Sequence, residues 1–126
     1  MGYMRAHAIV VDSFDDKLID EAHAEAIEIF SGVAPVTEIT KSTVNGHRSF
    51  MVAPDGSKEG WPESDAGDRA RLRFKTYARS KSYDDGSTAL HWIEVFFADD
   101  EGEVGIEDHD GRESHRSDTR TYADLD

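Results

Sequence analysis

The chain has 126 residues and no cysteine, and its 27 Asp and Glu residues outnumber 14 Lys and Arg residues, for a formal net charge of −13 at pH 7. The missing thiols exclude disulfides, thiolate nucleophiles and cysteine-ligated metal sites, and we expect a cytoplasmic location. Such a charge repels phosphate groups, so we expect no direct contact with nucleic acid or an anionic membrane.

The N-terminal third predicts a strand followed by a helix. Arg5–Val11 is short, apolar and β-branched at its end, as strands are. Apolar residues then recur at helical spacing over Phe14–Phe30, with acidic residues at the positive end of the helix. Gly32 is the type of residue that ends a helix, and Pro35 reinforces the break.

The next segment predicts a β-hairpin. Val36–Val44 and His47–Ala53 both alternate and are rich in strand-forming residues. Asn45-Gly46 lies between them, and this pair favours a tight hairpin turn, in which both central residues need positive φ. Pro54-Asp55-Gly56 then predicts the turn that ends the second strand.

The C-terminal half predicts one helix and one strong strand. Pro62 and the acidic residues after it favour a helix start, and one apolar stripe runs along Glu63–Ser82. Ala89–Ala98 has the strongest strand pattern in the chain, and Glu103–Glu107 predicts a short edge strand after a turn at Asp99–Gly102.

The order of elements predicts an α+β fold. It reads β-α-β-β-α-β with an extra C-terminal strand, which is the ferredoxin-like arrangement: an antiparallel sheet with two helices on one face. We expect residues 1–107 to form a single domain and residues 108–126 to be a polar, flexible tail.

The excess of acid has three interpretations. It can serve solvation, including adaptation to high salt, it can bind a basic protein surface or imitate a nucleic acid, or it can bind metal. The second interpretation predicts a non-catalytic protein whose partner has a basic surface. The acidic residues that would form this surface are Asp84, Asp85, Asp99, Asp100, Glu101, Glu103, Glu107, Asp108 and Asp110.

The strand Ala89–Ala98 is apolar on both faces, although two helices cover only one side of such a sheet. Because Glu94 is charged, we expect its face to be the open one. Trp92 and Phe96 share that face, so we predict that Trp92, Glu94 and Phe96 meet a partner or a second copy of the chain. The alternative is that the tail or the edge strand covers them.

No motif indicates catalysis or a cofactor. The chain has no GxSxG, GxGxxG or phosphate-binding glycine loop, and its histidines follow no metal-binding pattern. Asp99–Asp110 looks superficially like a calcium loop, but Val104 stands where that loop needs glycine. We therefore predict no catalytic residue, no metal site and no cofactor, with a small metal-dependent or hydrolytic enzyme as the remaining alternative.

One stretch carries a resemblance to other proteins. Asn45-Gly46-His47-Arg48-Ser49-Phe50 and Ala53-Pro54-Asp55-Gly56-Ser57-Lys58-Glu59-Gly60-Trp61, followed by Glu63-Ser64-Asp65 and Gly67-Asp68, resemble small phage and prophage accessory proteins without an assigned activity. The resemblance, over residues 45–102, implies a viral or mobile-element accessory role in the host cytoplasm or the virion. A structural component of a virus particle, from a halophile for example, is the alternative to an acidic binding protein.

Overall fold

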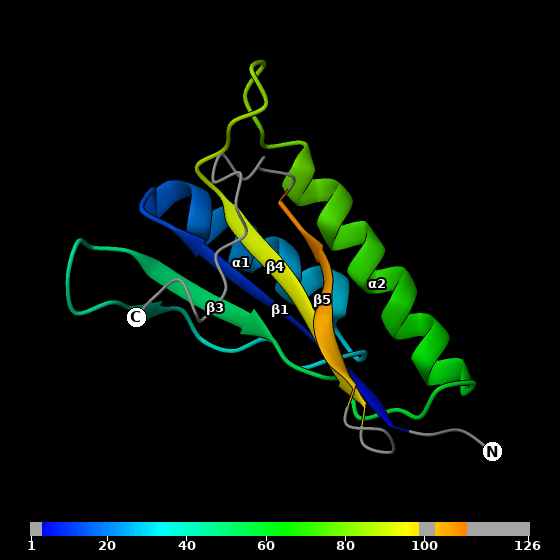
Figure 1. Cartoon of the computed structure of the whole chain (residues 1–126). Coiled ribbons are helices and arrows are strands. Elements are labelled where there is room, and N and C mark those ends of the chain that lie inside the picture. Colours follow the sequence, from blue (N-terminus) through cyan, green and yellow to red (C-terminus); the bar gives the residue numbers. More distant parts are fainter. Residues whose placement is uncertain (1–3, 99–102, 111–126) are drawn as a thin grey trace, which may run out of the picture.

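A computed structural model describes residues 4–98 and 103–110, which form an antiparallel five-stranded sheet with two helices (Figure 1). The strands are β1 (Arg5–Ser13), β2 (Thr40–Lys41), β3 (Arg48–Val52), β4 (His91–Ala98) and β5 (Val104–His109). Their spatial order is β2-β3-β1-β4-β5. The predicted α+β class is confirmed, and the strand order is consistent with a ferredoxin-like arrangement to which β5 adds an edge strand.

The two helices lie side by side on one face of the sheet, α1 (Asp16–Phe30) against β1 and β3, and α2 (Pro62–Arg79) along the β4 side (Figure 1). Asp15 caps α1, because its carboxylate accepts a hydrogen bond from the Leu18 amide at 3.0 Å. Pro62 occupies the first turn of α2, where no backbone donor is needed.

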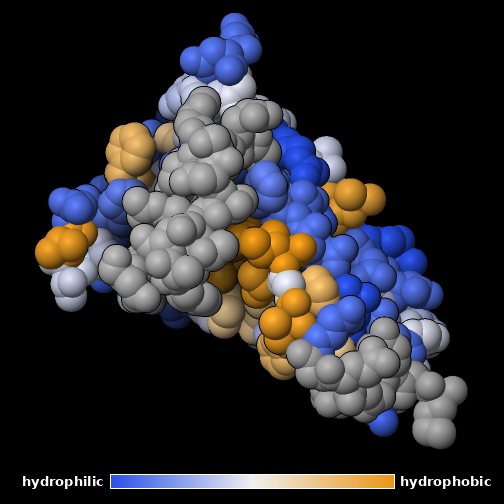
Figure 2. All heavy atoms as spheres, in the orientation of Figure 1, coloured by the Kyte–Doolittle hydropathy of each residue, from blue (hydrophilic) through white to orange (hydrophobic). Residues whose placement is uncertain are grey.

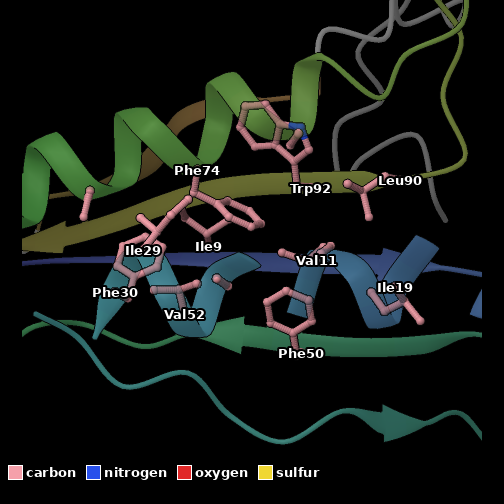
Figure 3. Close-up of a cluster of buried hydrophobic side chains, with 14 residues drawn as sticks. Ile9, Val11, Ile19, Ile29, Phe30, Phe50, Val52, Phe74, Leu90 and Trp92 are labelled. Carbon is pink, nitrogen blue, oxygen red and sulfur yellow. The ribbon is translucent and has the colours of Figure 1, made fainter. Parts of the chain in front are cut away.

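The core lies between the sheet and the helices (Figure 3). Phe30 from α1 and Phe74 from α2 are both fully buried, with ring centroids 6.1 Å apart. They pack on side chains that β1 and β3 direct to the same side of the sheet, among them Ile9 and Val52. This packing fixes which face of the sheet is covered.

Most of the predicted elements are present with small changes at their ends. The hairpin turn is confirmed, since Asn45 and Gly46 have φ values of 63° and 67°. The strand predicted over Val36–Val44 is reduced to β2. The Thr37 hydroxyl accepts a hydrogen bond from the Met51 amide, in place of the backbone carbonyl that would accept it in a regular strand pair.

The predicted domain boundary after Glu107 cuts through β5, because that strand continues to His109. Residues 111–126 of the predicted tail, and the predicted turn at Asp99–Gly102, lie outside the described residues. In the part of the chain that the structure describes, neither helix has the length and apolar character needed to cross a bilayer.

Candidate functional site

The face of β4 that meets the helices is the opposite of the predicted one. Trp92 and Glu94 are buried at 4% and 2% exposure, and Trp92 points toward α2 (Figure 3). Phe96 is half-buried and lies under the Arg5 guanidinium, 4.2 Å from the ring centre. The prediction that these three residues form an exposed partner face is therefore wrong.

The error has a physical cause in α2. Glu94 is charged, but α2 places the Lys75 ammonium 2.5 Å from its carboxylate, so the charge is paired inside the fold. Arg79 covers Trp92, with its guanidinium carbon 5.0 Å from the ring centre. An acidic residue on a strand thus indicates the solvent-facing side of a sheet only when no cation from a helix packed on the sheet pairs with it.

The other side of the sheet carries an uncharged apolar surface. Pairing of β1 with β4 and of β4 with β5 brings Val10 beside Ile93, Val95 beside Ile106, and Phe97 beside Val104. We call the following nine residues the open face: Ala6, Ala8, Val10, Met51, Ile93, Val95, Phe97, Val104 and Ile106.

Several residues of the open face are accessible to solvent. Phe97 is 53% exposed, Ile106 62% and Val104 71%. Figure 2 shows the apolar side chains gathered on this side of the molecule, over β4 and β5. Exposed apolar surface that is continuous across neighbouring strands is typical of an interaction site.

Polar groups lie at one end of the open face. Asp12 accepts hydrogen bonds from the Ser49 hydroxyl at 2.7 Å and from His47 Nδ1 at 2.6 Å, and His91 lies 3.2 Å from Asp110. Ser49 donates to the carboxylate and not to a histidine, so the arrangement is not the serine–histidine pair of a typical hydrolase. Within residues 4–98 and 103–110, no group of His, Asp and Glu has the geometry of a metal site.

A second feature lies between α2 and the sheet, where buried charged side chains meet. Glu94 accepts from His7 Nδ1 at 2.9 Å and from Lys75, and Arg71 Nε lies 3.7 Å from the same carboxylate. Arg71 is 4% exposed. We call the set His7, Asp55, Arg71, Lys75, Glu94 and Asp108 the charge cluster.

Each cation of α2 in the charge cluster bridges two or more carboxylates. Arg71 binds Asp55 at 3.2 Å and Asp68 at 2.7 Å, and Lys75 reaches Asp108 of β5 at 3.2 Å. The cluster thereby connects α2 to β4, β5 and the loop that follows β3. Buried charges are tolerated only when paired in this way.

The pairing changes the acidity of the carboxyl groups. Burial alone would raise the pKa of Glu94, but hydrogen bonds from His7 and Lys75 outweigh it and hold that pKa below its ordinary value. The pKa of Asp55 is lowered in spite of its burial by hydrogen bonds from Ser57 and Arg71. The pKa of Asp108 is lowered, against burial, by Arg79, the His109 amide and Lys75.

A cleft of about 310 Å³ opens onto the charge cluster between α2 and strands β1 and β4. His7, Arg71, Lys75 and Glu94 line its inner part, and Arg5, Glu59, Asp68 and Glu107 line the remainder. Because Glu94 is a carboxylate and only accepts, Nδ1 of His7 carries the hydrogen.

The acidic residues named from the sequence that the structure describes lie in separate parts of the fold. Asp84 and Asp85 lie in the loop before β4, and Glu103 comes after its end, so the length of the strand separates them (Figure 1). Asp99, Asp100 and Glu101 are outside the described residues.

The acidic residues named in β5 and after it have partners within the fold. Glu107 lies 3.3 Å from Arg5, Asp108 lies 2.8 Å from Arg79, and Asp110 interacts with His91. These groups are therefore not a free acidic surface.

Sequence reasoning missed the residues that build the charge cluster. Its signal was present in α2, where Gly67, Arg71 and Lys75 follow one another at four-residue steps beside the apolar stripe. A side chain at Gly67 would collide with the Asp55 carboxylate, so the glycine makes room for the ion pair of Asp55 with Arg71. The distant partners of these cations come from the loop after β3, from β4 and from β5, which no spacing in α2 reveals.

Comparisons with known proteins leave function to the geometry, since no family model matches the chain and no significant match was found among curated proteins or solved structures.

Proposed function

We propose that the protein acts by association with a second copy of itself through the open face. The observation that carries this proposal is that nine neighbouring residues on four strands are all apolar, in a chain of which 33% of the residues are charged. A sheet in a two-layer fold with helices on one side needs a cover for its other side when that side is apolar.

A second copy is a better occupant than the chain's own C-terminal segment. Residues 111–126 contain Tyr122, Ala123 and Leu125 as their apolar side chains, and the rest is polar or charged. That is too little to match the open face. Two open faces, in contrast, complement one another in a two-fold symmetric contact in which two sheets pack face to face.

The net charge of the chain is compatible with a dimer formed through the open faces. At −13, two copies repel each other, but the open face itself carries no charge, so the charged groups stay in solvent on the outer sides. Burial of apolar area does not weaken in salt, whereas the repulsion is screened. We therefore expect the pair to persist, and to strengthen, as the salt concentration rises.

Light scattering coupled to size exclusion tests this proposal. The 14.1 kDa chain should give a molar mass twice that value at low and at molar salt. Phe97→Asp and Ile106→Asp should shift the protein to the monomer, since each places a charge in the contact. Val44→Asp is the matched control, because Val44 is equally exposed at 68% but lies in the hairpin turn, away from the open face.

A wild-type protein that is monomeric at both salt concentrations and at high protein concentration would overturn the proposal. So would a dimer that all three variants leave intact, because the contact would then lie elsewhere.

A basic partner is the second candidate, favoured by the outer side of α1. Asp16, Asp20, Glu21 and Glu28 are exposed there, although Arg48 already lies 3.5 Å from Asp16 and 3.3 Å from Asp20. A polycation such as polylysine should bind at low salt and be released at high salt. Binding that does not change with salt would exclude this electrostatic role.

An accessory role in a virus or mobile element, or in a virus particle, stays a prediction that rests on the resemblance of residues 45–102. Self-association fits an assembly component and a small accessory protein equally, so the oligomer test does not depend on the origin of the chain.

A further inference from the structure

A cavity of about 270 Å³ lies at one end of the open face, where β4 begins. Val10 and Ile93 of the open face line it, together with His91, Trp92 and His109. A cavity of roughly 150 Å³ is large enough to hold a benzene ring. This cavity therefore has room for one aromatic side chain.

The opposite end of the open face carries an aromatic side chain of that size. Phe97 is the one aromatic residue among the nine of the open face, and it is 53% exposed. It follows Ile93 by four residues on β4, which places it roughly 13 Å along the strand from the cavity. That distance is too long for Phe97 to enter the cavity of its own chain, but Phe97 of a second copy can reach it.

We propose that self-association through the open face inserts Phe97 of each copy into the cavity of the other copy. This inference rests on the proposed function and adds the arrangement of the two copies. The two β4 strands run antiparallel across the contact, and the two-fold axis passes near Val95, which lies midway between Ile93 and Phe97. Sheets that pack face to face commonly keep their strands aligned within about 30° in this way.

The charges at the two ends of the open face favour this arrangement over one in which like ends meet. Asp12 and Asp110 flank the cavity, so like ends would bring the four carboxylates of two copies into one contact, which is unfavourable. The end that carries Phe97 and Val104 adds no charge to the open face. With opposite ends together, Asp12 and Asp110 stay at the rim of the contact, where protein interfaces are polar.

The dissociation constant of the dimer tests the role of Phe97. Phe97→Ala should raise it at least about thirtyfold, as truncation of an aromatic side chain in a pocket does. Val104→Ala is the matched control, and it should raise the constant less than about fivefold although Val104 is more exposed, at 71%. Val10→Trp keeps the surface apolar but fills the cavity, so it should weaken the dimer as strongly as Phe97→Ala. Circular dichroism shows whether each variant is folded.

Cross-linking tests the arrangement, because the chain has no cysteine of its own. Val104→Cys places a thiol beside Phe97, and His109→Cys places one beside the cavity, opposite Ile93. A mixture of these two variants, treated with a bis-maleimide that spans about 10 Å, the spacing of packed sheets, should give a linked pair with one chain of each. Val104→Cys alone should stay unlinked, and so should its mixture with Val44→Cys.

The possible results separate this inference from the proposed function. A dimer that gives no link between Val104→Cys and His109→Cys, or that links Val104→Cys to itself, would overturn the arrangement and leave self-association intact. Equal effects of Phe97→Ala and Val104→Ala, or no effect of Val10→Trp, would overturn the insertion of Phe97 in the same way. A wild-type chain that is monomeric would overturn both.

Discussion

His7 of β1 and Glu94 of β4 lie diagonally across two paired strands, and His7 Nδ1 donates to the Glu94 carboxylate over 2.9 Å. The register explains the contact, since His7 is opposite Phe96 while Glu94 is opposite Ile9, so both side chains point to the helix side of the sheet. Lys75 and Arg71 of α2 meet the same carboxylate. This carboxylate, together with Asp55 and Asp108, holds α2 in register with the sheet.

Glu94→Gln should destabilise the fold by about 3 kcal/mol, because it leaves buried cations with one fewer carboxylate. Urea unfolding at pH 7 and at one fixed protein concentration measures this. Glu107→Gln is the control, since Glu107 is exposed and pairs with Arg5 at the surface, and its removal should cost less than about 1 kcal/mol. Equal losses in the two variants would contradict a special role for Glu94.

Acid should unfold the protein through the same carboxylates. The pKa values of Glu94 and Asp55 are lower in the folded chain than in the unfolded chain, so the unfolded chain binds more protons in acid. Their contribution to stability is complete at neutral pH and should be lost progressively below about pH 5. Urea midpoints measured between pH 7 and pH 3 should fall less steeply in Glu94→Gln than in the wild type, and Glu38→Gln should follow the wild type.

Trp92→Ala and Phe97→Ala distinguish the two faces of β4. Trp92 packs in the core, so its truncation should cost about 3–5 kcal/mol of unfolding free energy. Phe97 is exposed on the open face, and its truncation should cost under about 1 kcal/mol in the monomer while weakening self-association. The reverse pattern in urea unfolding at low protein concentration would mean that the face of β4 with Trp92 is the open one.

Gly67→Ala should destabilise α2, although alanine favours helices by about 1 kcal/mol over glycine. The added methyl group would collide with Asp55 and crowd Arg71, so the buried ion pair would have to open. In an Asp55→Ala background the collision is absent, and Gly67→Ala should then be stabilising. Thermal unfolding of the wild type, the two single variants and the double variant checks whether the effect of Gly67→Ala on stability changes sign.

Local features were predictable because they depend on neighbours in the chain. The turn at Asn45-Gly46 follows from the positive φ that both residues tolerate, and α1 ends at Phe30, shortly before Gly32, whose φ is 73°. The strand predicted over Val36–Val44 was reduced because the Thr37 side chain competes for a backbone donor of β3, a contact between residues 14 positions apart.

The α+β class, the order of the elements and the two apolar sets on β4 were predictable without the structure, since alternation and helical spacing are properties of short segments. Which of those sets faces the helices was decided only by the tertiary structure, because Lys75 and Arg71 come from α2 and compensate the charge of Glu94. The open face and the cleft above the charge cluster also depend on contacts between distant segments. Strand pairing assembles the open face, whereas the packing of α2 on the sheet assembles the cleft.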